Sequence, residues 1–145
     1  MPHSFFNAQE QTSLLDAIRD AEINTSGEIR LHIENVCKYE VLDRAADVFA
    51  ELDMHKTELR NGVLFYLSIK DRKFAILGDA GINAKVPAGF WDSIREIVLN
   101  HFKNNLYAQG LSEGIKKAGV KLSEHFPYSK NDVNELSNDI SFKKN

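Results

Sequence analysis

The chain has 145 residues, of which 43% are hydrophobic and 27% charged, and its formal net charge is −3, as expected for one globular domain with a single core. It has no basic stripe interleaved with aromatic residues, which argues against a nucleic-acid partner, and its longest apolar run, Gly62 to Leu67, is too short to span a bilayer. The N-terminus does not read as a signal peptide, and a single cysteine, Cys37, excludes an internal disulfide, so we expect a cytoplasmic protein without membrane insertion.

The first half of the chain alternates helical and extended patterns. Asn7 and Glu10 have the spacing of a capping box, which predicts the start of a helix. Polar and apolar residues then alternate from Glu28 to Glu34, which predicts a strand with one poorly covered face, near an edge of the sheet. Apolar residues at spacings of three and four predict an amphipathic helix from Val41 to Met54.

The second half begins with the most apolar strand pattern. The segment from Val63 to Ile69 is apolar on both faces, which is typical of a strand in the middle of a covered sheet. A short turn connects it to Phe74–Leu77, so the two are expected to form a hairpin. A loop with several glycines follows, then an apolar helix near Trp91 to Phe102 and a last helix from about Gln109 to Phe126.

This order of elements predicts an α/β fold, namely an αβα three-layer sandwich with a small mixed sheet covered by helices on both faces. The first two strands are expected to run parallel through a right-handed crossover, and the third antiparallel to the second. Residues 1–127 are expected to form the domain, with Gly119 permitting close packing of the last helix. Residues 128–145 form a polar C-terminal tail that is either weakly docked or disordered.

The predicted topology places several acidic side chains at one end of the sheet. Glu28 begins the first strand, Asn61 precedes the second, and Asp79 follows the third. The polar loop that contains Glu58 and the helix start at Asp92 are expected at the same end. We therefore predict that these four carboxylates converge, with Asn61 beside them.

Such oxygen clusters bind hard divalent cations, so Ca²⁺ or Mg²⁺ is the expected cofactor of a metal site formed by Glu28, Glu58, Asp79 and Asp92. The glycines on either side of Asp79 would let backbone carbonyls join the coordination. The segment does not have EF-hand spacing, and carboxylates in loops also serve as plain helix caps or solvated charges.

Three other features allow more than one interpretation. Cys37 and His32 could form a thiol nucleophile with its base, although a lone cysteine is usually a small buried hydrophobic residue. His55 could join the acidic loops as a ligand or remain a solvated loop residue. The pair Phe90–Trp91 could be an exposed recognition patch, or one ring could lie in the core while the other covers the loop.

A set of short motifs resembles a known family. The motifs are Thr25–Ile29, Arg60–Leu64, Asp71–Phe74 and Gly78–Ile82, followed by the apolar helix near Trp91 to Phe102, Gly110–Leu111 and Gly114–Ile115. In order and spacing they are similar to the TPM domain family over about residues 5 to 127. The resemblance implies an αβα sandwich and an association with divalent metal, often calcium, at acidic loop residues.

What the resemblance implies about activity is less uniform. Some relatives have been credited with acid phosphatase activity, plant members act in maintenance of photosystem II, and others are accessory or interaction modules. Many relatives carry a signal peptide, a membrane anchor or a low-complexity tail, none of which is expected here, so the chain reads as a stand-alone cytoplasmic form.

Two functions are therefore open. The first is a divalent-metal-binding domain that acts as a metal-responsive regulatory or interaction module toward an unidentified protein partner. The alternative is a metal-dependent acid phosphatase that hydrolyses phosphate monoesters, in which the cation would polarise a phosphoryl oxygen and activate a bound water. No catalytic residue can be assigned, because the sequence has no Asp-x-Asp pair, phosphate-binding glycine loop or histidine phosphatase motif.

Overall fold

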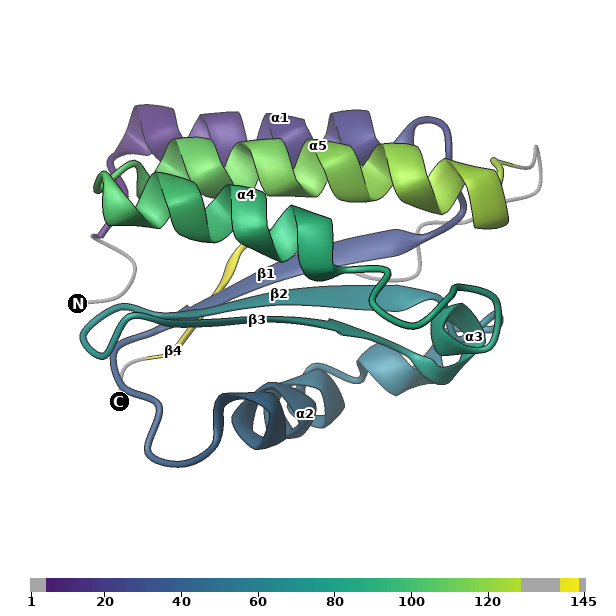
Figure 1. The fold of residues 1–145 in the computed structure, drawn as a ribbon, viewed down its shortest axis with the longest axis horizontal. Coiled ribbons are helices and arrows are strands. Elements are labelled where there is room, and N and C mark those ends of the chain that lie inside the picture. Colours follow the sequence, from purple (N-terminus) through teal and green to yellow (C-terminus); the bar gives the residue numbers. More distant parts are fainter. Residues whose placement is uncertain (1–4, 129–138, 144–145) are drawn as a thin grey trace.

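Helices and a mixed sheet form three layers in residues 5–128 and 139–143, which the computed structural model describes (Figure 1). The helical elements are α1 (Ala8–Glu22), α2 (Val41–Glu51), the 3-10 helix η2 (Met54–Lys56), α3 (Ala80–Asn83), α4 (Asp92–Lys103) and α5 (Tyr107–His125). The strands are β1 (Glu28–Glu34), β2 (Gly62–Ser68), β3 (Lys73–Gly78) and β4 (Ser141–Lys143). The predicted capping box is present, with reciprocal bonds between Asn7 and Glu10.

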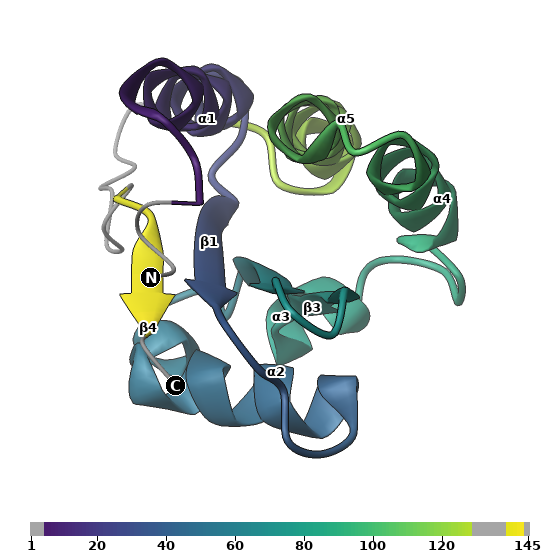
Figure 2. The same cartoon turned by 90° about the vertical axis from the view of Figure 1, so that its left-hand side faces the viewer.

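The strand order within the described residues is β3-β2-β1-β4. Strand β1 is parallel to β2 and to β4, and β2 is antiparallel to β3, so the predicted crossover and hairpin are confirmed. Figure 2 shows α1, α4 and α5 in one layer above the sheet and α2 below it, and Figure 1 shows α3 at one end of the sheet. The expected αβα sandwich is therefore the observed fold.

The larger hydrophobic core lies between the sheet and the layer of α1, α4 and α5. Strand β2 is buried at every position, as its apolar pattern predicts. Gly119 lies where α5 crosses α1, and a Cβ atom there would be 2.6 Å from Cβ of Ala21. The close helix packing expected at this glycine is thus observed.

The prediction that Glu28–Glu34 lies near an edge of the sheet, with one poorly covered face, is wrong. Strand β1 lies inside the sheet, between β2 and β4, and His32 and Glu34 on its polar face are only 3% and 0% exposed. Alternation correctly predicts which residues share a face, but it does not reveal what covers that face. Here polar side chains are buried because they are paired with one another and with α2.

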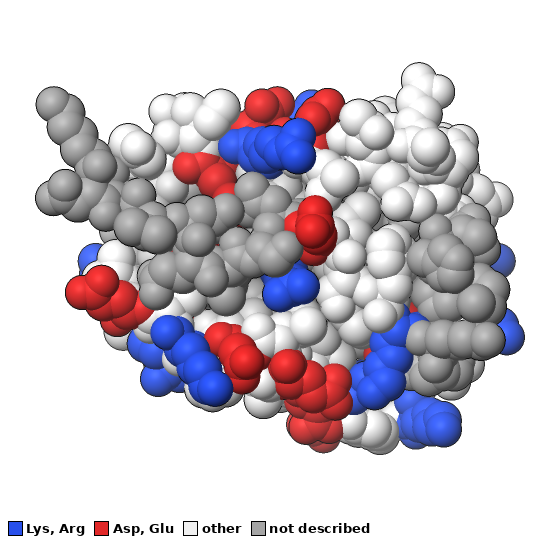
Figure 3. All heavy atoms as spheres, turned by 180° about the vertical axis from the view of Figure 1, so that it is seen from behind, with Lys and Arg blue, Asp and Glu red and all other residues white. Residues whose placement is uncertain are grey.

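The C-terminal segment contributes the fourth strand. Ser141, Phe142 and Lys143 pair in parallel with His32, Ile33 and Glu34. The rest of the predicted tail falls largely on residues 129–138 and 144–145, which lie outside the described residues. Within the described part of the chain, no helix has the length and apolar character needed to cross a membrane. Seen from behind, acidic and basic side chains of the described residues are interspersed (Figure 3).

Candidate functional site

The start of β1, the start of β2 and the end of β3 lie at the same end of the sheet. The backbone N–H of Glu28 donates to the carbonyl of Asn61 at 3.1 Å, and the N–H of Asp79 donates to the carbonyl of Gly62 at 2.9 Å. Strand register thus brings together Glu28, Asn61 and Asp79, which are far apart in the sequence.

Asp79 is the best-defined carboxylate at this end. Its side chain is 5% exposed, and its two oxygens accept hydrogen bonds from Nε and Nη2 of Arg60, both at 2.8 Å. One of these oxygens also caps α3 by accepting from the N–H of Ala80 at 2.7 Å. Burial alone would raise the pKa of Asp79, but the bonds from Arg60 and Ala80 outweigh it and hold the pKa below its usual value. Asp79 is therefore ionised and paired with the guanidinium of Arg60.

The loop that carries Arg60 closes tightly over the start of α3. The N–H of Gly81 donates to the carbonyl of Arg60 at 2.9 Å, and a Cβ atom at Gly81 would lie 2.1 Å from the carbonyl oxygen of Leu59. Arg60 itself adopts a left-handed backbone with a φ of 52°. Gly81 is therefore required for the contact between this loop and the Asp79 turn.

Asn61 brings a further oxygen to this end of the sheet. Its side-chain Nδ2 donates to the carbonyl of Ser26 at 2.8 Å, which fixes the orientation of the amide. The Oδ1 atom is buried and has no hydrogen-bond partner among the described residues. Amide oxygens are common ligands of hard cations, so this atom is chemically suited to the kind of ion that the sequence predicts.

The other three predicted ligands differ from Asp79 in exposure. Glu28 is buried at the start of β1, whereas Glu58 lies exposed in the loop before β2 and Asp92 lies exposed in the first turn of α4. Within the described ranges, no three His, Cys, Asp or Glu side chains are grouped so that they could hold a metal ion. The donor types suit a hard cation, but a bound ion would require Arg60 to leave Asp79 and the exposed carboxylates to approach.

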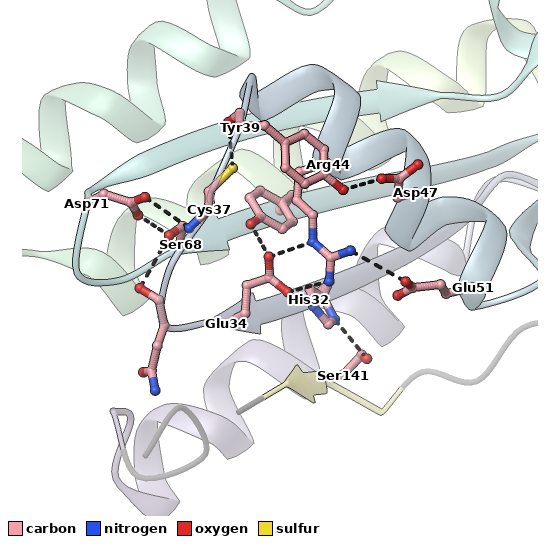
Figure 4. Close-up of polar contacts among 12 residues, drawn as sticks. His32, Glu34, Cys37, Tyr39, Arg44, Asp47, Glu51, Ser68, Asp71 and Ser141 are labelled. Atoms are coloured by element: carbon pink, nitrogen blue, oxygen red, sulfur yellow. Dashed lines mark hydrogen bonds and ion pairs between the residues drawn. The ribbon is translucent and has the colours of Figure 1, made fainter. Parts of the chain in front are cut away.

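A second polar cluster lies below the sheet and was not predicted from the sequence (Figure 4). Glu34 accepts hydrogen bonds from Nε and Nη2 of Arg44 at 2.8 and 2.9 Å and a further bond from the hydroxyl of Tyr66. Nε2 of His32 lies 3.0 Å from Glu34, and its Nδ1 lies 2.9 Å from the hydroxyl of Ser141. The cluster thus ties α2 to β1, β2 and β4.

The charges in this cluster are fixed by their pairing. Burial raises the pKa of Glu34, but hydrogen bonds from Arg44, His32 and Tyr66 outweigh it and hold the pKa well below its usual range. Burial together with the neighbouring Glu34 carboxylate raises the pKa of Tyr66. A buried ion pair with this many partners is costly to break, so it constrains how α2 packs on the sheet. The available sequence signal was the run of polar residues at alternate positions of β1.

The proposed pairing of Cys37 with His32 is not formed. Both ring nitrogens of His32 are occupied, by Glu34 and Ser141, while the thiol of Cys37 donates to the carbonyl of Tyr39 at 3.2 Å. Cys37 is buried in the smaller core beneath the sheet. It therefore belongs to the packed interior, in line with the simpler interpretation of a lone cysteine.

Comparison with known proteins identifies the family and the fold. The model of the TPM domain matches residues 2–121. The NMR structure of the BA42 protein from the psychrophilic bacterium Bizionia argentinensis is 48% identical, with a TM-score of 0.91 over 97% of each chain. No curated protein sequence matches the chain.

Two more distant solution structures share the fold. The N-terminal domain of a protein from P. gingivalis is 18% identical, with a TM-score of 0.69 over 85% of this chain and 80% of that one. The N-terminal domain of the cg2496 protein from Corynebacterium glutamicum is 10% identical, with a TM-score of 0.65 over 92% of this chain and 78% of that one.

Proposed function

The chain belongs to the TPM domain family, and on this premise we propose that it binds a divalent cation, Ca²⁺ or Mg²⁺, at Asp79 and acts as a metal-responsive regulatory or interaction module. The observation that carries the proposal is the pairing of Asp79 with Arg60. A buried, ionised carboxylate is balanced there by a guanidinium whose side chain is 49% exposed. An exposed cation on a loop is the kind of partner that a divalent ion can replace without leaving the buried charge uncompensated.

Further ligands would come from the carboxylates predicted for this end of the sheet. Glu58 lies two residues before Arg60 in the same loop, Asp92 opens α4, and Glu28 begins β1. Carboxylate and amide oxygens are what Ca²⁺ and Mg²⁺ require, and a bound ion offsets the repulsion between gathered carboxylates. The residues that move are those of the Arg60 loop, because Asp79 is fixed at the end of β3.

This arrangement supports regulation better than hydrolysis. Release of Arg60 from Asp79 would alter the loop that packs on Gly81, and with it the surface at this end of the domain. Hydrolysis of phosphate monoesters, the alternative implied by the family, needs a carboxylate free to attack or to orient water. In the proposed site Asp79 coordinates the cation and also caps α3 through the N–H of Ala80, so it is not free for either role.

The test is a titration of chelator-treated protein with Ca²⁺ and with Mg²⁺, followed by backbone amide NMR shifts. We expect saturable shifts near Glu28, Glu58–Asn61 and Asp79–Asp92. Asp79→Asn should abolish these shifts. Arg60→Ala should tighten binding of the divalent cation several-fold, because it removes the guanidinium that competes for Asp79. Asp16→Asn, an exposed carboxylate on α1, is the matched control and should bind as the parent does.

Two results would overturn the proposal. One is a titration in which Asp79→Asn binds the cation as tightly as the parent protein. The other is an Arg60→Ala variant with unchanged or weaker affinity, because Arg60 would then not compete for the site. The same variants are also assayed for hydrolysis of a phosphate monoester with and without the cation. Cation-dependent hydrolysis that is lost in Asp79→Asn would favour the phosphatase over the regulatory or interaction module.

A further inference from the structure

Strand β3 forms one edge of the sheet in the described part of the chain. Strand β3 is the terminal strand in the order β3-β2-β1-β4, and no described residue pairs with its outer side. Figure 1 faces this edge, with β3 running across the front between α4 above and α2 below. Exposed strand edges present unpaired N–H and C=O groups that can add another strand.

The strand register identifies which backbone groups face outward. Asp79 donates to Gly62, so residues 73, 75, 77 and 79 point toward β2, and the N–H and C=O groups of Phe74, Ile76 and Gly78 point away from it. A side-chain bond agrees with this assignment, because Nδ2 of Asn83 donates to the carbonyl of Gly78 at 3.2 Å. The outer groups of Phe74 and Ile76 and the N–H of Gly78 remain available for an added strand.

This edge forms the floor of a groove of about 690 Å³. Residues 40–42 at the start of α2 form one wall, and residues 86–92 before and at the start of α4 form the other. Phe74 and Ile76 are only 3% and 8% exposed, because their side chains pack in the larger core. Their backbone lies between the two walls, since Phe74, Ala75 and Ile76 line the groove together with both of them. The walls are mainly apolar and carry an exposed leucine, Leu42, on the α2 side.

An unpaired donor lies beside the same edge. Nε1 of Trp91 is buried and has no hydrogen-bond partner among the described residues. It lies 3.4 Å from the position that a Cβ atom would take at Gly78. Both Phe90 and Trp91 line the groove, and the indole nitrogen lies over the face of β3 at Gly78, next to the edge to which a strand would add.

We propose that this groove binds an extended polypeptide segment of a partner protein, which adds to β3 as a further strand. The alternating outward donors and acceptors of Phe74 and Ile76 match the backbone of an extended peptide. Because successive side chains of a strand point to opposite faces, one set would contact Trp91 and its wall and the other set Val41 and Leu42. The preferred segment therefore has apolar or β-branched side chains on both faces.

The recess of the edge decides against a second copy of this chain as the occupant. Two β3 edges that each lie between their own walls cannot approach to the 4.7–4.9 Å, roughly, that neighbouring strands require. A single extended segment is thin enough to enter. This inference goes beyond cation binding. The groove wall shares Asp92 with the proposed cation site, so peptide binding is tested in the presence of a chelator, where no cation is bound.

The probe is a blocked peptide of alternating valine and threonine with a lysine at each end, added to the full chain in the presence of a chelator. We expect amide shifts at Phe74, Ile76 and Gly78 and in the two walls, with slower hydrogen exchange of these three outward amides. The control is a peptide of the same sequence in which every second backbone nitrogen is methylated, so that one edge of the extended peptide has no N–H donors. This peptide should bind at least tenfold more weakly, because that edge can no longer pair with β3.

Protein variants test the walls. Leu42→Lys, at a side chain that is 51% exposed, should weaken the peptide about tenfold, while Val120→Lys on the exposed face of α5 should leave binding unchanged. The proposal fails if the methylated peptide binds equally well, if the outward amides keep their exchange rates, or if shifts map to another surface. It also fails if the free protein dimerises through β3. Failure of cation binding, with peptide binding intact, leaves this inference standing.

Discussion

Glu34 and Arg44 form an ion pair beneath the sheet, with two hydrogen bonds of 2.8 and 2.9 Å between a carboxylate that is fully buried and a guanidinium that reaches it from α2. Tyr66 and His32 occupy the remaining positions around the carboxylate. A buried charge with this many partners is costly to leave unpaired, which makes the pair a strong constraint on how α2 packs.

Glu34→Gln should therefore destabilise the fold by about 3 kcal/mol, because the largely buried Arg44 loses its closest carboxylate and keeps only the more distant Glu51. The control is Glu51→Gln, which removes the more exposed and more distant partner of Arg44 at 3.4 Å and should cost less than about 1 kcal/mol. Chemical denaturation of both variants measures the difference. If both variants lost the same free energy of unfolding, burial of Glu34 would not explain the contribution of its ion pair.

Stability should also depend on pH through Glu22. Burial raises the pKa of its carboxyl to about 7 from an ordinary 4.5, a bond from the N–H of Ile29 partly opposes this, and Glu28 adds to it. Between these two values the folded protein holds more protons than the unfolded chain, so stability is lost as the pH rises through that window.

Glu22→Gln removes this ionisation and should be more stable than the parent protein at pH 8, by up to about 3 kcal/mol, with the difference vanishing near pH 4.5. Urea unfolding between pH 5 and pH 8 measures the trend. The glutamine oxygen can still accept the N–H of Ile29, so the local bond is retained. A parent protein that gains stability relative to this variant as the pH rises would contradict the sign.

Gly81→Ala should destabilise the protein by about 2 kcal/mol or more, because the new Cβ would lie 2.1 Å from the carbonyl of Leu59 and would force the Arg60 loop outward. Gly78→Ala is the control, since its Cβ would meet the nearest atoms at 3.4 Å. Thermal unfolding compares them, and amide shifts at Arg60 report loop displacement. Similar melting temperatures for both variants would mean that the loop adapts freely.

Gly119→Val tests the crossing of α1 and α5. The Cβ of any larger residue would lie within 2.7 Å of both the Cα and the carbonyl oxygen of Ala21, so the helices must separate at a cost of about 2 kcal/mol or more. The adjacent exposed Val120→Ala should change stability by less than about 0.5 kcal/mol. A tolerated valine at position 119 would imply that α1 can shift without loss of packing.

The sequence pattern predicted the strand pairing that places the candidate site, but not the state of its side chains. Glu28, Asn61 and Asp79 lie at one end of the sheet because a parallel crossover and a short hairpin leave little choice of direction. That Arg60 would hold Asp79 depends on a left-handed residue in a loop, for which periodicity carries no signal. The metal ligand set therefore remains a prediction.

Local patterns also failed where a long-range partner decides the outcome. The polar face of β1 reads as exposed, yet His32 and Glu34 are buried because Arg44 and Ser141 arrive from α2 and β4. The three residues of β4 are too few to show a period, and only pairing with β1 makes them a strand.

By itself, the sequence determined the αβα architecture, since side-chain periodicity and connection lengths are properties of neighbouring residues. Only the tertiary structure decided which polar groups are buried, that Asp79 pairs with Arg60, and that β3 forms an edge of the sheet. Those outcomes depend on contacts between residues far apart in the chain, where burial and pairing fix the free energy of each charge and each hydrogen-bonding group.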